Sequence, residues 1–307
     1  MSRTNHLKVI VSGGGTGGHI FPAVAIANAI KKKYPDAEIL FVGAKGKMEM
    51  EKVPKAGYPI KGLWISGLQR KLTVANLMFP LKVLVSLIHS MFIIKSFKPN
   101  IAIGVGGYAG GPLLKAATML GVPALIHESN SFPGITNKLL GKSVNKVCVA
   151  FPDMEKYFPK NKLVITGNPV RQEIVKLAGK REDALKQFKL DNNRPVILVI
   201  GGSLGARSVN QAIDEALPKI KENNYQVLWQ TGVHYKEQSI QAVKELVYDG
   251  VHPHEFIYEM DLAYAAADVV VSRAGAMSVS ELSLVAKPAI LVPYPYASED
   301  HQTKNAM

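Results

Sequence analysis

Three turns in the sequence combine small residues with the start of a helical pattern, and turns of this kind bind anions. The first is GGGTGGH at residues 13–19, which has the spacing G-x-G-x-x-G and follows the apolar run of residues 7–12. The others are GGSLGA at residues 201–206 and RAGAMSVSEL at residues 273–282. Glycine lets a phosphate or sugar approach the backbone, and the first amides of a helix attract negative charge. These turns therefore predict a phosphorylated ligand, although a glycine turn can also be purely structural.

The first turn is not typical of a dinucleotide site. Such a site needs an acidic residue at the end of the second strand to bind the ribose, whereas here that run ends in Gly43, Ala44 and Lys45. The sequence also has no Asp-x-Asp pair and no His/Cys cluster that would bind a metal ion. We therefore expect no metal and no cofactor. The second turn, with the hydroxyl of Ser203 among its amides, would neutralise a diphosphate instead.

Two residues are candidates for a general base. His19 ends the first glycine turn, and its ordinary pKa of about 6.5 is close to working pH. It could instead hydrogen-bond its own loop or bind a pyrophosphate as a cation. Glu128, in the motif HESN, is the alternative carboxylate base, although this motif can also be structural in part. The sequence alone does not choose between them.

A carboxylate stands one turn into the third helical pattern. Glu281 follows residues 276–280, which would present amides and hydroxyls at a helix N-terminus. A carboxylate in this position can accept hydrogen bonds from both hydroxyls of a ribose. It is equally the ordinary acidic residue that a helix dipole favours in its first turn.

Strand-like and helical patterns alternate along the chain and would position these turns. Apolar runs typical of strands occur at residues 7–12, 39–42, 101–105, 124–127, 147–150, 163–166, 196–200, 227–230, 256–258, 269–272 and 289–292. A helical pattern at 21–33 follows the first turn, and the strand, turn and helix order restarts after residue 194. This alternation predicts an α/β fold of two doubly wound, Rossmann-like parallel-sheet domains facing across a cleft. The boundary falls at GNPVR, giving domains 1–166 and 167–307.

The excess of positive charge lies entirely in the first half of the chain. Residues 1–160 contain 21 Lys and Arg against 7 Asp and Glu, and residues 161–307 contain 16 against 17. A basic half suits an anionic lipid, a phosphorylated substrate or nucleic acid, or serves solubility only. No array of aromatic residues accompanies the basic residues, so nucleic acid is disfavoured. The single cysteine, Cys148, and the lack of a signal peptide pattern indicate the cytoplasm.

One apolar segment is long enough, by length alone, to span a membrane. Residues 74–94 are mostly apolar, but Pro80, Lys82 and His89 interrupt them, and a charge near the middle disfavours spanning. Arg70 and Lys71 precede the segment, as expected for a helix that rests on anionic headgroups. We therefore predict peripheral binding to an anionic membrane surface. The alternative is that the segment is buried in the core of the first domain, and both can hold for opposite faces.

Seven motifs occur in the order and spacing of a known family. They are GGGTGGH, GGYAGGP (106–112), HESN (127–130), GNPVR (167–171), GGSLGA, RAGAMSVSE and DHQTKNA (300–306). The chain thus resembles, over nearly its whole length, the MurG family, the bacterial N-acetylglucosaminyltransferases of glycosyltransferase family 28. The resemblance implies a GT-B fold and inverting transfer of N-acetylglucosamine from UDP-GlcNAc to undecaprenyl-pyrophosphoryl-MurNAc-pentapeptide (lipid I), which gives lipid II in peptidoglycan synthesis. It also implies a peripheral position on the cytoplasmic face of the inner membrane.

The resemblance also assigns roles to particular residues. For the donor it implies contacts of Ser203 with phosphate, Ile257 with uracil through its backbone, Ala276, Met277, Ser278, Val279 and Ser280 with the diphosphate and ribose region, Glu281 with the ribose, and Gln302 with the sugar. From the first domain it implies sugar contacts by Thr16, Gly17, Gly18 and Asn130, with Arg171 reaching in from the linker.

Two departures from the family pattern limit this assignment. The family usually has glutamine where Ser129 and Leu204 stand, so contacts of those side chains are in doubt. The chain also ends at Met307, before the helices that complete the family's second domain, so we expect that domain to be truncated. Two other hypotheses remain open: a GT-B transferase with a different lipid acceptor, and a non-catalytic subunit that binds a nucleotide sugar.

Overall fold

A computed structural model describes residues 6–67, 77–297 and 300–307. The chain divides into two compact units, residues 1–169 and 170–307, where the sequence indicated a boundary after residue 166. Each unit contains one parallel sheet with helices on both faces, so the predicted doubly wound α/β architecture is confirmed.

Unit 1 contains a seven-stranded parallel sheet in the order β3-β2-β1-β4-β5-β6-β7. Its strands are β1 (Lys8–Ser12), β2 (Glu38–Ala44), β3 (Ile60–Leu63), β4 (Ile101–Gly104), β5 (Ala124–Glu128), β6 (Lys146–Val149) and β7 (Leu163–Ile165). The strand order reverses between β1 and β4. In an open α/β sheet, this switch point is where the loops at the carboxyl ends leave room for a ligand.

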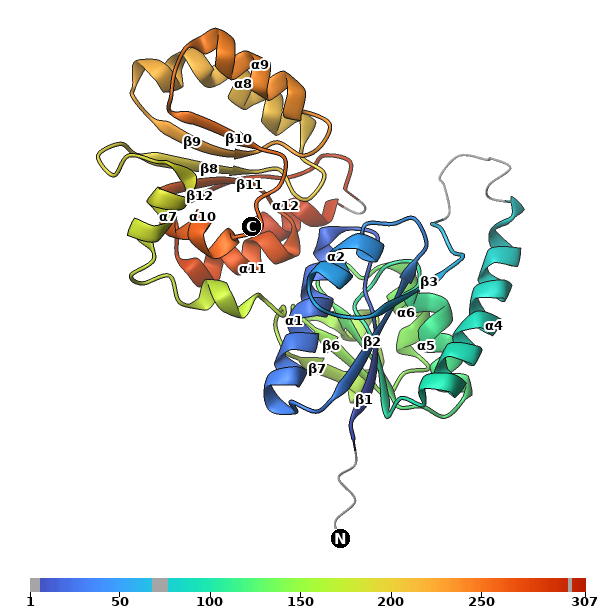
Figure 1. Cartoon of the computed structure of the whole chain (residues 1–307). Helices are drawn as coiled ribbons and strands as arrows, with labels where there is room; N and C mark the ends of the chain where they lie inside the picture. The colour runs from blue at the N-terminus through green and yellow to red at the C-terminus, as the bar shows by residue number, and fades with distance from the viewer. Residues whose placement is uncertain (1–5, 68–76, 298–299) are drawn as a thin grey trace. The chain divides into compact units, whose positions relative to one another are not determined.

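Helices cover both faces of this sheet, because both faces of a parallel sheet are apolar. The helices of unit 1 are α1 (Gly17–Lys33), α2 (Glu49–Lys55), α4 (Phe79–Phe97), α5 (Gly110–Met119) and α6 (Ile135–Gly141), with short 3₁₀ turns at Met154–Lys156 and Lys160–Lys162. Val9 and Val11 point into a core with α1 and α2, whereas Ile10 points into a core with α4, α5 and α6. Figure 1 shows these two layers of helices around the sheet.

Unit 2 repeats the plan with a five-stranded parallel sheet in the order β10-β9-β8-β11-β12. Its strands are β8 (Val196–Ile200), β9 (Gln226–Gln230), β10 (Val251–His254), β11 (Val269–Arg273) and β12 (Ala289–Val292). The strand predicted at residues 256–258 is wrong, because the edge strand lies at β10 instead. Pro253 lies within β10, and an edge strand tolerates a proline whose missing amide faces away from the sheet.

Helices again cover both faces of the second sheet. They are α7 (Arg181–Phe188), α8 (Arg207–Glu222), α9 (Lys236–Leu246), α10 (Met260–Ala266), α11 (Ala276–Val285) and α12 (His301–Ala306), with a 3₁₀ turn at Gln172–Val175. Val199 and Trp229 pack toward α8 and α9, and Leu198 and Leu228 pack toward α7, α10 and α11. Figure 1 shows α8 and α9 on one face of the sheet and α7, α10 and α11 on the other.

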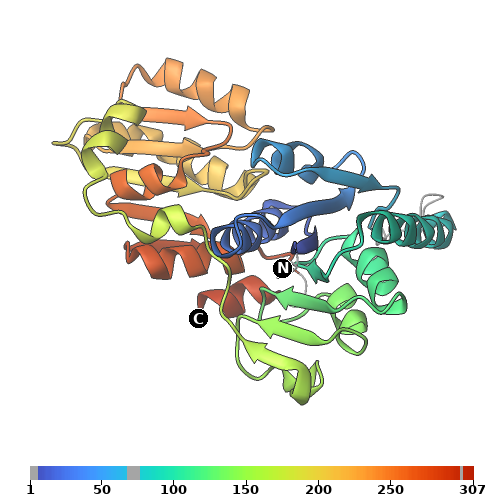
Figure 2. The ribbon, with the colours of Figure 1, turned by 60° about the horizontal axis from the view of Figure 1, so that its bottom comes forward.

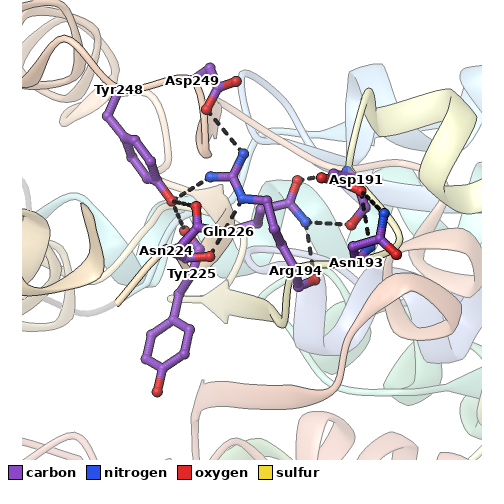
Figure 3. Close-up of polar contacts among 8 residues, drawn as sticks. All are labelled: Asp191, Asn193, Arg194, Asn224, Tyr225, Gln226, Tyr248 and Asp249. Carbon is purple, nitrogen blue, oxygen red and sulfur yellow. Dashed lines mark hydrogen bonds and ion pairs between the residues drawn. The ribbon is translucent and has the colours of Figure 1, made fainter. Parts of the chain in front are cut away.

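A polar network holds the amino ends of β8, β9 and β10 together (Figure 3). The Arg194 guanidinium donates to the Asp249 carboxylate at 3.0 Å and to the hydroxyl of Tyr248. The Gln226 side chain donates to the backbone carbonyl of Asp191 at 2.8 Å and accepts from its amide at 2.7 Å. This network fixes the edge of the sheet opposite the glycine turns.

Helix α4 exposes a row of large apolar residues, while its buried positions include two serines beside Ile93 and Ile94. Its buried positions include Ser86 and Ser90, and the Ser86 hydroxyl donates to the Trp64 carbonyl at 3.0 Å. Its exposed large apolar residues recur at helical spacing and are Leu81, Leu84, Val85, Ile88 and Phe92. In Figures 1 and 2 the helix lies along the outer side of unit 1, beside α5. By length and composition alone α4 could cross a membrane. Core helices of soluble proteins can have the same length and composition.

Candidate functional site

The two glycine-rich loops at the switch point of unit 1 touch each other. A Cβ atom on Gly107, which follows β4, would lie 2.5 Å from the carbonyl oxygen of Gly14, which follows β1. The backbone at Gly107 has φ of 90°, which glycine adopts readily. The motifs GGGTGGH and GGYAGGP therefore pack against each other at the carboxyl edge of the sheet.

The glycines of the first turn have different functions. A Cβ on Gly13 would lie 2.6 Å from the backbone oxygen of His19, so this position lets the turn pack against α1. A Cβ atom on Gly18 would have the Thr16 hydroxyl as its nearest neighbour, at 3.7 Å, and both residues are exposed. Gly13 therefore serves the fold, whereas Thr16 and Gly18 are exposed on either side of the buried Gly17.

His19 is half-buried at the start of α1 and is held in one tautomer. Its Nδ1 lies 3.1 Å from the Gly14 carbonyl oxygen, which can only accept a hydrogen bond, so Nδ1 carries the proton. Nε2 is then unprotonated in the neutral ring, and a Cβ atom added to Gly106 would lie 2.7 Å from it. Burial lowers the pKa of His19, more than the nearby Glu128 carboxylate and the Gly14 carbonyl raise it. The imidazole is therefore neutral at neutral pH and can accept a proton at Nε2.

Glu128 has the geometry of a structural carboxylate. It is buried at the end of β5 and accepts four hydrogen bonds, from the backbone amides of Asn130 (3.0 Å) and Gly134 (3.1 Å) and from the side chains of Asn130 (3.2 Å) and Asn137 (2.8 Å). These donors occupy both oxygens and shape the loop after β5. The geometry therefore favours His19 over Glu128 as the base. The side-chain amide of Asn130, which we expected to meet the sugar, here donates to Glu128.

The motifs HESN and GNPVR are joined within unit 1. His127 Nε2 lies 3.0 Å from the Gly167 carbonyl oxygen, and the Asn168 side chain donates to the Ser129 carbonyl at 3.2 Å. Burial lowers the pKa of His127. Both contacts tie the end of β5 to the segment that leads into unit 2, so part of each motif is structural.

The Gln230 side chain connects two segments of unit 2 that are expected to bind the nucleotide sugar. The sequence analysis did not identify this residue. From the end of β9 its side chain donates to the Gly202 carbonyl at 3.0 Å and accepts from the Ile257 amide at 3.0 Å. The turn containing Ser203 and the loop containing Ile257 are thus fixed to one another. Because the Ile257 amide is already used, a backbone contact with uracil at this position would need the carbonyl.

The third turn begins α11 at the carboxyl end of β11. The helix starts at Ala276 after Gly275, which provides no side-chain cap, so the amides of residues 276–278 face the N-terminal end of the helix. The hydroxyl of Ser280 donates back to the Ala276 carbonyl at 2.9 Å. Its proton therefore points along the helix, and a ligand would use the hydroxyl oxygen as an acceptor only.

Glu281 is engaged by two other side chains of unit 2. Its exposed fraction is 5%, and its two oxygens accept from Arg171 Nε at 3.0 Å and Nη2 at 3.1 Å. The Tyr264 hydroxyl donates to the same carboxylate at 3.1 Å. Burial raises the pKa of Tyr264 well above its usual value, and the neighbouring carboxylate adds to this effect. Arg171 thus forms an ion pair with the carboxylate that we expect to bind the ribose.

Helix α12 brings Gln302 to the same edge of the sheet. The Asn305 side chain donates to the Ala274 carbonyl at 3.2 Å, and Oε1 of the Gln302 side chain accepts from the Tyr294 amide at 2.9 Å. Arg273, buried at the end of β11, donates to the Pro293 carbonyl at 2.9 Å and to the Ser208 hydroxyl at 2.7 Å. It therefore joins the loops after β11 and β12 to the start of α8.

No group of three or more His, Cys, Asp or Glu residues in the described part of the chain is arranged to hold a metal ion.

Comparison with known proteins places this site in a family. The model of the glycosyltransferase family 28 N-terminal domain matches residues 9–149, and that of the C-terminal domain matches residues 196–307. The chain therefore belongs to glycosyltransferase family 28, and its two doubly wound units are those of the GT-B fold.

Particular relatives narrow the class further. The chain is 55% identical to a Flavobacterium psychrophilum protein named UDP-N-acetylglucosamine–N-acetylmuramyl-(pentapeptide) pyrophosphoryl-undecaprenol N-acetylglucosamine transferase, covering 97% of this chain and 81% of that one. A Cytophaga hutchinsonii protein of the same name is 56% identical, covering 98% and 80%.

Solved structures have the same fold as this chain. The Acinetobacter baumannii MurG structure superposes with a TM-score of 0.70 at 31% identity, covering 98% of this chain and 82% of that one. A UDP-GlcNAc 2-epimerase from Neisseria meningitidis, at 14% identity and a TM-score of 0.64, shares the fold over 98% of this chain and 89% of that chain.

Proposed function

We propose that this chain transfers N-acetylglucosamine from UDP-GlcNAc to undecaprenyl-pyrophosphoryl-MurNAc-pentapeptide, with inversion at the anomeric carbon. The observation that carries the proposal is the identity of more than half of the residues, over nearly the whole chain, with relatives that bear the name of this activity. The two switch-point sites supply what the reaction needs. Unit 2 offers amides and a ribose-binding carboxylate for the donor, and unit 1 offers a base for the acceptor.

On the donor side, the carboxyl edge of the second sheet is suited to a nucleoside diphosphate. The turn at Ser203 and the N-terminus of α11 present amides that favour the negative charge on the leaving UDP. Glu281 would accept hydrogen bonds from the ribose. Because Arg171 already pairs with that carboxylate, the ribose would either share the carboxylate with the arginine or displace the arginine from it. A displaced guanidinium can pair with phosphate.

On the acceptor side, His19 would remove the proton from the attacking hydroxyl. Its Nε2 carries the lone pair, its Nδ1–H is fixed by the Gly14 carbonyl, and burial keeps the ring neutral. A general base needs both the open nitrogen and the neutral form. The glycine backbone at Thr16 to Gly18 borders this group, which supports sugar binding there.

The exposed apolar stripe of α4 supports contact with a membrane, where the lipid-linked acceptor would be found. A soluble helix normally buries its large apolar residues, whereas Phe92 is 66% exposed and Leu84 is 54% exposed. Lys82 within the stripe donates to the Ser66 hydroxyl at 3.0 Å, and Lys95 and Lys98 lie exposed near the end of the helix. The expected basic residues Arg70 and Lys71, and the start of the apolar segment at residues 74–76, lie outside the described residues. We place the chain peripherally on the cytoplasmic face of the inner membrane.

Replacing Leu84 and Ile88 with glutamate is expected to weaken binding to vesicles of phosphatidylglycerol. Burying one leucine-sized side chain is worth about 1.5 to 3 kcal/mol, so each substitution should cost about tenfold or more. Sedimentation with vesicles measures this, and binding of the unmodified chain should fall as salt is added. Ile165→Glu, on the exposed edge strand β7, is the matched control and should bind normally. Equal binding to phosphatidylcholine vesicles, or no binding to either, would contradict the prediction.

The choice of acceptor is tested by UDP release with a panel of acceptors. The proposal expects UDP release with a short-chain lipid I analogue and little with an undecaprenyl-linked sugar that lacks the muramyl residue. Preference for the second acceptor would favour the alternative of a GT-B transferase with another lipid acceptor. UDP-GlcNAc binding without turnover on any acceptor would favour the non-catalytic subunit.

A further inference from the structure

A buried carboxylate in unit 1 has no part in the functions proposed so far. Glu49 is the first residue of α2, and its exposed fraction is 1%. Its Oε1 accepts from the Ala44 amide at 2.9 Å, and its Oε2 accepts from the Gly15 amide at 2.8 Å. One side chain thus bridges the end of β2 and the glycine turn after β1.

Two glycines make room for this side chain. A Cβ atom on Gly14 would lie 2.3 Å from Glu49 Oε1, and one on Gly43 would lie 2.5 Å from Glu49 Cγ. Any larger residue at either position would displace the carboxylate. The glycines at 14 and 43 are therefore explained by the side chain of Glu49, without a ligand.

The carboxylate is linked to His19 through a single peptide group. Glu49 accepts a hydrogen bond from the Gly15 amide, and His19 Nδ1 donates to the Gly14 carbonyl at 3.1 Å. This amide and this carbonyl belong to the same planar peptide unit. Fixing the N–H of this unit fixes the direction of its C=O. Hydrogen bonds at both ends of a peptide group also polarise and strengthen one another.

We propose that Glu49 is a positioning residue that orients the Gly14–Gly15 peptide and thereby holds His19 with Nδ1 protonated and Nε2 open. The proposal rests on the role of His19 as base in the proposed function. It assigns Glu49 no contact with either substrate, because the side chain is enclosed by the turn and β2.

Two carboxylates face His19 from different elements, Glu49 from α2 and Glu128 from β5. Both raise the pKa of His19, against the larger lowering by burial. Removing the charge of Glu49 would therefore lower the pKa of His19 further. A role in folding alone would not produce this shift.

The test is Glu49→Gln, with Glu51→Gln as the matched control. Glutamine offers one acceptor oxygen and an NH₂ group, so it cannot accept from both amides. Glu51 lies on the same helix but is exposed and pairs with Lys55, and its substitution changes the net charge equally. We expect E49Q to lower kcat by about 10², the cost of misplacing a reacting group, with the KM for UDP-GlcNAc unchanged. The acid limb of the kcat profile should move to lower pH, and E51Q should match the unmodified chain.

Nitrogen NMR of histidine-labelled protein gives a measurement that does not depend on turnover. In the unmodified chain neutral His19 should be the Nδ1–H tautomer, and in E49Q it should become a mixture with a lowered pKa. An Nε2–H tautomer in the unmodified chain would overturn the proposal even if E49Q does not fold, and so would an unchanged tautomer and pKa in E49Q. If the NMR changes occur but E49Q turns over normally, the positioning role stands and His19 is not the base.

Discussion

Replacing His19 with alanine is expected to lower kcat by about 10² to 10⁴, the usual contribution of a general base. The KM for UDP-GlcNAc should change little, because the imidazole acts in the transition state and not in donor binding. In the unmodified enzyme kcat should rise with pH as His19 loses its proton. Because burial lowers the pKa of His19, this rise should be centred below the ordinary histidine pKa of about 6.5.

Two variants serve as controls for this result. His6→Ala removes an exposed histidine of the same unit and should leave kcat unchanged. Glu128→Gln removes a buried charge with four hydrogen-bond donors around it, so we expect a lower melting temperature and a smaller fall in kcat than for His19→Ala. Near-normal kcat in His19→Ala together with a large loss in Glu128→Gln would show that Glu128 is the base.

Replacing Glu281 with alanine is expected to weaken UDP binding by roughly 10- to 150-fold. Hydrogen bonds to a charged group contribute about 1.5 to 3 kcal/mol, and a factor of ten corresponds to 1.4 kcal/mol. The KM for UDP-GlcNAc should rise in parallel, since the ribose is bound in both the ground state and the transition state. Isothermal titration with UDP measures the affinity directly.

The structure adds a cost that the sequence did not reveal. Removing Glu281 leaves Arg171 and Tyr264 without their shared acceptor, and breaking a buried ion pair from one side costs about 3 to 5 kcal/mol of stability. Asp268→Ala is the matched control, because Asp268 also pairs with an arginine, Arg181, but at the amino end of the same sheet. It should lower stability and leave UDP affinity unchanged. Unchanged UDP affinity in Glu281→Ala would mean that the carboxylate serves the helix and Arg171 only.

Most of the fold could be predicted because parallel strands buried on both faces are continuous apolar runs. The run at residues 7–12 and its successors match strands, and the restart after residue 194 matches β8. The exceptions are short edge strands, which need little apolar sequence. Neither β3, with the exposed Lys61, nor β10, with Pro253, was predicted.

The candidate site could be predicted only as far as local motifs reach. Glycine turns and the residues that follow them lie close together in the sequence, so His19 and Glu281 could be picked out. Their partners are remote: Glu49 reaches the turn at Gly15, and Gln230 joins Gly202 to Ile257. Such contacts depend on strand order, and a carboxylate in a segment with several lysines, as Glu49 is, has the pattern of an ordinary surface residue.

The most direct test of the account is analysis of the product itself. The purified chain is incubated with UDP-GlcNAc and a short-chain lipid I analogue, and the product is examined by mass spectrometry and by proton NMR of the anomeric region. The account predicts addition of one N-acetylhexosamine to the muramyl sugar, with the new glycosidic bond in the β configuration, opposite to that of the donor. A product that retains the donor configuration, transfer to another part of the acceptor, or hydrolysis of UDP-GlcNAc without transfer would contradict it.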